Sequence, residues 1–394
     1  MFFSEYLLFP SGGRSHYRIP TVIATKNGTV IAVCNDRKDT LSDTAQEVSL
    51  VYAVKRGDAP WSGIKILTGI PGWDCWCGST AYDDDTDTVF VFGGRNPQNT
   101  DEYKIYTEEE KQKLKAYRIE EGKRLGLTIG GIKWESRDDG ETWTETSFEH
   151  ALSVTKFTHS DGRVLETGGN THGSAHGIIL RHGSHRGRLV NPYRFGVGDY
   201  DSVSQIRFHT YNNCIYSDDH GKTWTAGGPA QIGTGEGAII ENADGSLTLN
   251  SRAYFGDGRR RLATSRDGGA TWEDFRIDDS LIEDTFIGCN ASLIRVEPTE
   301  LSDPGLLPDG ADGITVFCNP FSEKRLNMTL SVSFDSGKTW AFHKTLHPDS
   351  SVYSSLVFSA KNQRFYLLYE KGTATEDIKY GITAVEFDAE WLLA

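Results

Sequence analysis

The chain has few cysteines, an excess of acidic over basic residues and no long apolar run, and each shortage excludes a class of protein. The six cysteines are scattered, and Cys75 and Cys77 lack the two-residue spacing of zinc knuckles, so we expect free, mostly buried thiols. The net charge of −14 argues against nucleic-acid binding, because no broad basic face is available for phosphates. No apolar run approaches the length of a membrane span.

The first residues do not resemble a secretory signal. No basic segment followed by a long apolar segment opens the chain, and residues 6–10 are too few to form one. The sequence therefore predicts a cytoplasmic protein without a membrane span. A secreted or periplasmic location is the alternative if the sequence is a trimmed form.

An eight-residue pattern, S-x-D-x-G-x-T-W, occurs four times, at residues 136–143, 217–224, 265–272 and 333–340. The residue types suit a hairpin turn, because the Asp accepts backbone N–H groups across the loop and the Gly supplies a positive φ. We expect the Trp to re-enter a strand with its indole under the turn. The copies are unevenly spaced, which predicts repeated small sheets joined by loops of variable length.

This repeat is the Asp-box, and nearly the whole chain resembles the sialidase (neuraminidase) superfamily. The resemblance implies an all-β, six-bladed β-propeller that spans residues 1–394 as a single domain. Such a ring accommodates 394 residues because each blade packs on its neighbours. The 42 glycines, 11% aromatics and short apolar runs agree with a chain of many hairpins.

A helical segment is expected within one blade, at about residues 101–126. Thr107 and Glu110 form a capping box, and Glu109 and Lys113 are spaced as an i,i+4 ion pair. The predicted helix runs from about residue 108 to 121, with Gly122 ending it. For this helix, a solvent-exposed insertion is favoured over a lid or a dimer contact.

Residues 17–20 read YRIP and follow a Gly-rich turn. We expect a strand from about residue 17 that continues to residue 33, with Arg18 near its start. A lone Arg at a strand end is usually a surface charge. The segment, however, is similar to the [FY]-R-I-P signature of sialidases, whose Arg binds the carboxylate of sialic acid.

Residues 35–43 (NDRKDTLSD) read as a polar loop after an apolar strand, and such loops often carry functional residues. The resemblance implies that Arg37 contacts the O4 region of the sugar and that Asp43 is the general acid. Asp36 and Asp39 are alternatives by residue type.

Residues 73–80 (WDCWCGST) depart from the Pro-containing segment of the family. Asp74 is the candidate for a second O4 contact, and the two tryptophans fit core packing as well as a pocket wall. In residues 170–177 (NTHGSAHG), His172 and His176 have the spacing of helical metal ligands. Because glycines interrupt the segment and no acidic third ligand is near, we expect a strand resembling the G-x-x-H-G segment of sialidases and no metal.

Glu236 lies between two glycines just before an apolar strand, and flanking glycines permit close backbone approach. Arg252 follows in the segment LNSRAYFG, whereas Arg259, Arg260 and Arg261 are expected on a blade surface.

The last third of the chain supplies three further candidates. Arg325, in NPFSEKRLNMT, matches the third Arg of sialidases. Tyr353, in VYSSL, matches the nucleophile, with Ser355 in place of the family's Asp. Glu370, in LYE, matches the Glu that braces the first Arg, and residues 386–393 are expected to form a terminal strand.

Together these residues suit a carboxylate-bearing sugar. Guanidinium groups bind carboxylates bidentately, so Arg18, Arg252 and Arg325 would hold the substrate, while Glu370 offsets their mutual repulsion. A Tyr nucleophile avoids the repulsion that a carboxylate nucleophile would meet, and Glu236 would be its base. With Asp43 as general acid, the resemblance implies a retaining exo-α-sialidase that needs no cofactor.

Two alternatives stay open. The same residues could act on another nonulosonic acid, such as deaminated sialic acid, or transfer sialic acid rather than hydrolyse its glycosides. A glycan-binding propeller without catalysis is the more distant alternative, because a binding module would need only some of these side chains.

Overall fold

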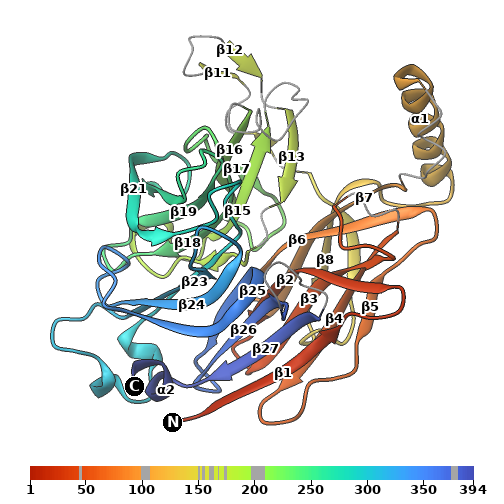
Figure 1. Cartoon of the computed structure of the whole chain (residues 1–394). Helices are drawn as coiled ribbons and strands as arrows, with labels where there is room; N and C mark the ends of the chain where they lie inside the picture. Colours follow the sequence, from red (N-terminus) through yellow and green to blue (C-terminus); the bar gives the residue numbers. More distant parts are fainter. Residues whose placement is uncertain are drawn as a thin grey trace.

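The structure is a computed structural model that describes residues 1–43, 47–98, 107–149, 151–152, 156–158, 164–166, 168–172, 175–196, 209–373 and 380–394. Almost all of its regular elements are strands (Figure 1), which confirms the all-β prediction. The helices among these residues are α1 (Glu108–Arg124) and α2 (Ala389–Leu393), with short 3-10 turns at Gly183–His185, Pro298–Glu300 and Pro304–Leu306. No helix in this part of the chain is long and apolar enough to cross a membrane.

The strands form small, almost entirely antiparallel sheets in chain order. One sheet contains β2 (Ser15–Ala24), β3 (Thr29–Lys38), β4 (Val48–Arg56) and β5 (Lys65–Thr68). The next contains β6 (Trp73–Asp83), β7 (Thr88–Pro97), β8 (Gly130–Ser136) and β9 (Thr144–Ser147). Another contains β18 (Thr234–Glu241), β19 (Leu247–Ala253), β20 (Arg259–Ser265) and β21 (Glu273–Ile282).

Between the last two lies a sheet of β10 (Ala151–Leu152), β13 (Gly168–His172), β14 (Ile178–Ile179), β15 (Leu189–Gly196), β16 (Thr210–Ser217) and β17 (Thr225–Ala226), beside a hairpin of β11 (Lys156–Thr158) and β12 (Val164–Glu166). The final sheet contains β22 (Ser292–Val296), β23 (Ile314–Pro320), β24 (Leu326–Ser333), β25 (Phe342–Ser359), β26 (Arg364–Lys371), β27 (Gly381–Phe387) and β1 (Phe3–Pro10).

The sheets follow one another in a propeller-like cycle. The strands β2, β6, β15, β18, β22 and β25 contact one another in that order, and β25 contacts β2 again. A cluster of buried apolar side chains lies between each sheet and the next, and a further cluster lies within the large final sheet, so the core is divided into several parts around the cycle. The N-terminal strand β1 pairs with β27, and the two termini lie near each other (Figure 1).

The four Asp-boxes form the predicted turns. In the first, Thr142 N donates to Asp138 Oδ1 at 2.9 Å and Gly140 N donates to Ser136 Oγ at 2.9 Å, and the other three repeat this pattern. Each box Gly has a positive φ, between 75° and 93°. The residue before it also has a positive φ, so the turn holds two consecutive left-handed residues. The indole of Trp224 donates to Gly221 O at 3.0 Å, beneath its own turn.

The inserted helix is confirmed, but its predicted end is wrong. Thr107 and Glu110 form the capping box, and Lys113 Nζ lies 2.7 Å from Glu109 Oε1. Gly122 lies inside the helix, which continues to Arg124. A Cβ at Gly122 would lie 2.4 Å from the ring of Trp73, so the glycine permits close packing there rather than a helix end. Residues 101–106 of the predicted segment lie outside the described residues.

Three further expectations need correction or confirmation. The single strand predicted for residues 17–33 is a hairpin of β2 and β3 that turns at Gly28, which has φ +86°. The predicted terminal strand ends at Phe387, and most of the remainder is α2. Five of the cysteines are buried thiols that form no disulfide, as predicted; the side chain of Cys77 lies outside the described residues.

Candidate active site

A buried tyrosine, glutamate and arginine meet where β18, β19 and β25 come together. Tyr353 Oη lies 2.7 Å from Glu236 Oε1, and Arg252 Nη1 lies 2.9 Å from Tyr353 Oη and 2.5 Å from Glu236 Oε2. All three side chains are buried. The structure therefore brings together three sequence candidates that are up to 117 positions apart in the chain.

The glycines beside Glu236 allow this close packing. A Cβ at Gly235 would lie 2.2 Å from Tyr254 Oη, and one at Gly237 would lie 2.1 Å from Asn212 Nδ2. Because real Cβ atoms do not approach other atoms so closely, any larger residue would push β18 away from its neighbours. The Gly-Glu-Gly pattern thus has a steric cause.

Two arginines control the charge on Glu236. Burial alone would raise the pKa of this carboxyl, but Arg252 and Arg194 outweigh it and lower the pKa to about 2. Arg194 Nη1 lies 3.9 Å from Glu236 Oε1 and donates to Tyr254 Oη at 3.0 Å. Burial and the nearby Glu236 raise the pKa of Tyr353 above its usual range. Without substrate, the pair is therefore a carboxylate and a neutral phenol.

Glu370 braces the first arginine and the tyrosine strand together. Its Oε1 accepts from Arg18 Nε at 2.6 Å and from Ile19 N at 2.8 Å, while Oε2 accepts from Tyr353 N at 3.1 Å. The Arg18 guanidinium lies 5.5 Å from the centre of the Tyr353 ring. Ile19 has φ +59°, a strained conformation for a β-branched residue, within a register shift of β2. The strain coincides with the bond from Ile19 N to Glu370.

Arg37 and Asp43 form an adjoining pair. Arg37 lies in strand β3 rather than in the predicted loop, and its side chain is 1% exposed, against 84% for Asp43. Their ion-pair distance is 2.8 Å. The carbonyl of Leu41 accepts from Arg37 Nη1 at 2.7 Å and from Arg18 Nη1 at 3.1 Å, which joins this pair to the first arginine. Burial and the charge of Arg18 lower the pKa of Arg37.

Asp74 is buried on β6, where its Oδ1 accepts from Val48 N at 3.2 Å. Val48 is the strand partner of Arg37, so Asp74 lies beside that arginine's strand. Of the neighbouring tryptophans, Trp73 packs against the inserted helix at Gly122, and the ring of Trp76 lies 5.1 Å from the Arg37 guanidinium. Trp76 is thus the tryptophan nearer to the candidate site residues.

Arg325 and Arg252 are held by one segment, residues 283–289. Arg325 Nε lies 3.3 Å from Asp284 Oδ2, and its Nη2 donates to Gly288 O at 3.1 Å. Arg252 Nε donates to Ile287 O at 2.8 Å. The positions of two substrate-binding candidates therefore depend on the same short segment.

That segment is fixed by residues that the sequence analysis missed. Arg260 Nη1 lies 2.7 Å from Glu283 Oε2 and donates to Cys289 O at 2.8 Å, and the two side chains are 0% and 1% exposed. Glu283 Oε1 accepts from Ala253 N at 3.0 Å. The expectation that Arg260 and Arg261 lie on a blade surface is wrong, because both are buried. No sequence motif marks Arg194 or Glu283, whose partners are distant in the chain.

One cluster of possible metal ligands exists among the described residues, at Asp83, Asp85 and His220. Asp83 Oδ2 lies 2.9 Å from His220 Nδ1, and Asp83 Oδ1 accepts from Asp85 N at 3.1 Å. These hydrogen bonds account for the cluster without an ion. The side chain of His172 lies outside the described residues, and that of His176 is buried and is not a member of this cluster.

Comparison with known proteins identifies the family of this chain. The model of the BNR repeat-like domain matches residues 40–366. A sialidase from Micromonospora viridifaciens is 33% identical over 262 residues, 65% of this chain and 35% of that protein. The chain belongs to the sialidase family with BNR repeats.

Other members of the family match over more of the chain. A sialidase from Bacteroides fragilis is 25% identical over 371 residues, 91% of this chain and 60% of that protein. The structure of an intramolecular trans-sialidase from Ruminococcus gnavus, in complex with oseltamivir carboxylate, matches at a TM-score of 0.70 and 17% identity over 98% of both chains. This last likeness concerns the fold. The chain spans less than two thirds of the length of the two sialidases.

Proposed function

We propose that this protein is an exo-α-sialidase that hydrolyses terminal α-ketosidic sialic acids with retention, using Tyr353 as the nucleophile. The observation that carries the proposal is the contact of 2.7 Å between Tyr353 Oη and the buried carboxylate of Glu236, with Arg252 on both groups. A phenol needs a base at hydrogen-bond distance before it can attack, and Glu236 meets that requirement. Sialylated glycans would be the substrates.

The proposal includes the architecture that presents the site. We infer six blades forming one domain over residues 1–394. The long strand β25 supports this division, because its first part pairs with β24 and its second part pairs with β26. Divided at this point, the large final sheet contributes two blades, and the second is completed by β1. Each innermost strand then delivers its first residues to the axis of the ring.

Arginine side chains would bind the substrate carboxylate. Arg18, Arg252 and Arg325 each carry hydrogen bonds that orient them, to Glu370, Ile287 O and Gly288 O respectively. Pre-oriented guanidinium groups bind a carboxylate with little further loss of side-chain freedom. Asp74, Arg37 and Trp76 would line the neighbouring O4 region.

In the first step, the Tyr353 oxygen bonds to C2 of the sialic acid while the glycosidic C2–O bond breaks. The phenol proton passes to Glu236, and Asp43 protonates the departing oxygen. The low pKa of Glu236 opposes this transfer in the free protein. A bound carboxylate would offset the charge of Arg252 and so raise the pKa of Glu236, while positive charge developing at C2 favours the phenolate.

In the second step, water bonds to C2 as the bond to Tyr353 breaks. Asp43 accepts the proton of the water, and Glu236 returns its proton to the phenolate. Two displacements at C2 leave the sugar in its original α configuration. Asp43 is suited to exchange protons with solvent and leaving group because its side chain is 84% exposed.

The test compares hydrolysis of a fluorogenic aryl α-sialoside by wild type, Tyr353→Phe and Asp43→Ala. We expect turnover by Tyr353→Phe to be at least about 10³-fold lower than turnover by wild type. The variant should still bind free sialic acid. Asp43→Ala should lose less with an aryl leaving group, which needs little protonation, than with a natural sialoside. Equal turnover by Tyr353→Phe and wild type would overturn the mechanism.

Product analysis by NMR tests the remaining parts of the proposal. Initial formation of α-sialic acid is expected, and an initial β anomer would indicate inversion. A transferred or internally bonded product would instead identify a transferase. No turnover of sialosides, with turnover of analogues changed at C5, would assign another nonulosonic acid as the substrate.

A further inference from the structure

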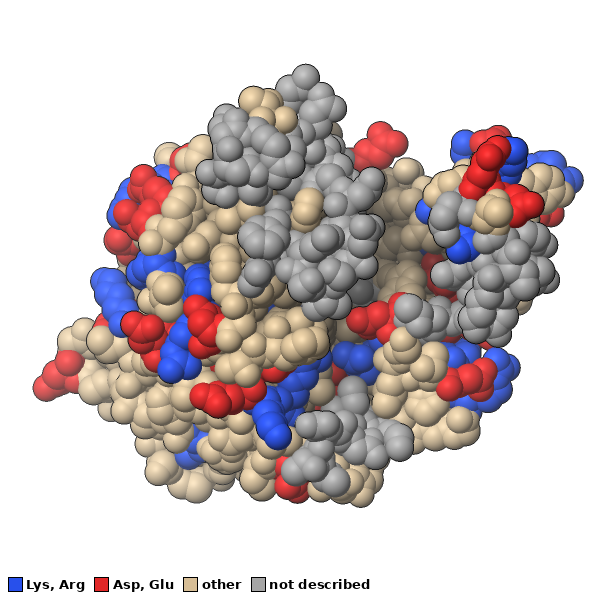
Figure 2. All heavy atoms as spheres, turned by 45° about the horizontal axis from the view of Figure 1, so that its top comes forward, with Lys and Arg blue, Asp and Glu red and all other residues tan. Residues whose placement is uncertain are grey.

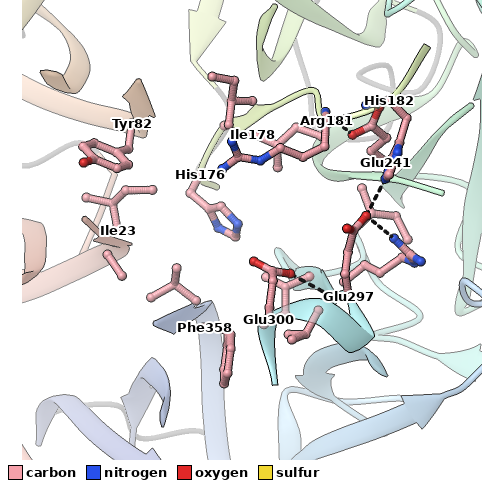
Figure 3. Close-up of a pocket in the computed structure, with 18 of the residues that line it drawn as sticks. Ile23, Tyr82, His176, Ile178, Arg181, His182, Glu241, Glu297, Glu300 and Phe358 are labelled. Carbon is pink, nitrogen blue, oxygen red and sulfur yellow. Dashed lines mark hydrogen bonds and ion pairs between the residues drawn. The ribbon is translucent and has the colours of Figure 1, made fainter. Parts of the chain in front are cut away.

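The strands that carry the candidate active site also border a cavity of about 590 Å³, near their opposite ends (Figure 3). Basic and acidic side chains line this cavity together. Glu297 lies 2.5 Å from His182 Nε2 and 3.2 Å from Arg295 Nη1. Glu241 accepts from the backbone N of Arg181 at 2.6 Å. The cavity therefore shows no preference for a cation or an anion. The loop after β3, at the active-site end, differs because it carries an accessible carboxylate.

The structure separates the three aspartates of this region, which residue type alone left as alternatives for the general acid. Asp36 is 5% exposed and forms an ion pair with a neighbouring lysine. Asp39 is exposed, but both of its carboxylate oxygens accept from Arg14. Asp43 has a side chain that is 84% exposed. Asp43 is thus the aspartate that a leaving group can reach, and Asp39 has a different task.

Arg14 holds Asp39 through its side chain and its main chain. Arg14 Nε lies 3.0 Å from both carboxylate oxygens of Asp39, and Nη2 lies 2.8 Å from Oδ2. Arg14 O accepts from Asp39 N at 2.7 Å. Asp39 has φ +64°, a left-handed conformation that aspartate adopts more readily than most residues. The contact is therefore made at the point where the backbone turns out of β3.

The same guanidinium group also contacts the other end of the loop. Arg14 Nη2 lies 3.3 Å from Glu47 Oε2, and Glu47 O accepts from Lys38 N at 2.9 Å. Glu47 is the residue before β4. Arg14 therefore joins the residue that leaves β3 to the residue that enters β4, and Asp43 lies between them in the chain. Arg14 also holds the pKa of Asp39 below its usual range, so this contact stays ionic at neutral pH.

The stretch between Asp39 and Asp43 is tied to the substrate arginines on its inner side. Leu41 O accepts from Arg37 and from Arg18, and Asp43 lies 2.8 Å from Arg37. The position of Asp43 thus depends on contacts of two kinds. The arginines of the site hold the middle of the loop, and Arg14 holds its ends.

We propose that Arg14 is a positioning residue for the general acid. By binding Asp39 and Glu47 together, it fixes the ends of the loop so that Asp43 reaches the glycosidic oxygen. The inference rests on the proposed function, in which Asp43 protonates that oxygen. Because Arg14 acts through proton donation, its loss should matter in proportion to the leaving group's need for a proton.

The test measures kcat/KM of the full chain for two substrates, 4-methylumbelliferyl α-sialoside, whose leaving group needs little protonation, and sialyllactose, whose leaving group needs it. Arg14→Gln should lower the value for sialyllactose at least about fivefold, mainly through kcat, and the value for the aryl sialoside less than about twofold. Arg14→Lys keeps the charge and should lie nearer to wild type. Arg266→Gln is the matched control, because Arg266 is an equally exposed arginine that binds two acidic side chains in another sheet, and it should change neither value.

A double variant tests whether Arg14 acts through Asp43. Adding Arg14→Gln to Asp43→Ala should cause no further selective loss with sialyllactose, because the group that Arg14 positions is already absent. A further loss of the same size as in the single variant would overturn the proposal.

Equal losses with both substrates, or no loss with either, in folded Arg14→Gln would also overturn it. Asp43→Ala distinguishes this failure from a failure of the proposed function. If Asp43→Ala is selective for sialyllactose and Arg14→Gln is not, the positioning role of Arg14 alone is wrong. If Asp43→Ala is itself unselective, Asp43 is not the general acid and both proposals fail.

Discussion

At the residue scale, the charge of Glu236 decides what the candidate site can do. Two guanidinium groups overcome the cost of burying this carboxylate, so it is ionised without substrate. Sequence motifs named Arg252 among the candidate substrate-binding residues, and the structure places it against Glu236 and Tyr353. They did not predict Arg194, which reaches the site from β15 and has no distinctive flanking residues.

We predict that Arg194→Gln moves the acidic limb of the pH–rate profile to higher pH. Arg194 lowers the pKa of Glu236, so its removal raises that pKa, and protonated Glu236 cannot accept the phenol proton. A displacement of about one pH unit is expected for loss of one nearby charge. The measurement is kcat/KM for an aryl sialoside from about pH 2 to 7, a range that reaches the wild-type pKa of Glu236. Arg194→Lys keeps the charge and should keep the limb; a lower plateau with an unmoved limb in Arg194→Gln would indicate a structural role alone.

At the element scale, the hairpins and turns were the predictable part of the fold, because the Asp-box fixes its hydrogen bonds within eight residues. Interactions between elements were not predictable in the same way. Gly122 satisfies the sequence rule for a helix end, yet it lies inside α1 and faces Trp73 on β6. Arg260 lies in a basic run that suggests surface, yet its carboxylate partner is supplied by residue 283 across the sheet.

We predict that Arg260→Met is destabilising by about 3–5 kcal/mol, because it leaves Glu283 buried without its countercharge. The double variant Arg260→Met, Glu283→Gln should recover much of this stability. The measurement is the free energy of unfolding from urea titration. The exposed pair Arg266 and Glu273 in the same sheet is the control, and Arg266→Met should cost less than about 1 kcal/mol.

The same double variant tests whether the segment of residues 283–289 positions the substrate arginines. Arg252 and Arg325 are hydrogen-bonded to carbonyl groups of this segment, so loosening it should raise KM for a sialoside more than it lowers kcat. A stable double variant with wild-type KM would show that the two arginines keep their positions without the buried pair.

At the scale of the whole molecule, acidic residues outnumber basic ones, and the net charge is −14. Acidic and basic side chains are mixed over the face drawn in Figure 2. Recognition of an anionic substrate would therefore depend on the local arginine cluster, since surface charges are screened beyond about 10 Å at ordinary salt. The composition predicted that a chain of negative net charge would need a local arginine cluster to bind an anionic substrate. Identifying the exact members of that cluster required the fold.

Closure of the ring gives the last prediction. The N-terminal strand β1 pairs with β27, and on it Phe9 is 0% exposed while Tyr6 is 58% exposed. Phe9→Ala should lower the free energy of unfolding by about 3–5 kcal/mol, because it leaves a cavity in the core between the first and last sheets. Tyr6→Ala on the same strand should change it by less than about 0.5 kcal/mol.

Urea unfolding followed by tryptophan fluorescence would measure both variants. Because each sheet packs mainly on its neighbours, a weakened closure frees the β27 edge for pairing with other chains before the remaining sheets unfold. Phe9→Ala should therefore also associate at lower urea concentrations than wild type, in light scattering. Equal stability of the two variants would mean that β1 covers the last sheet without holding the ring closed.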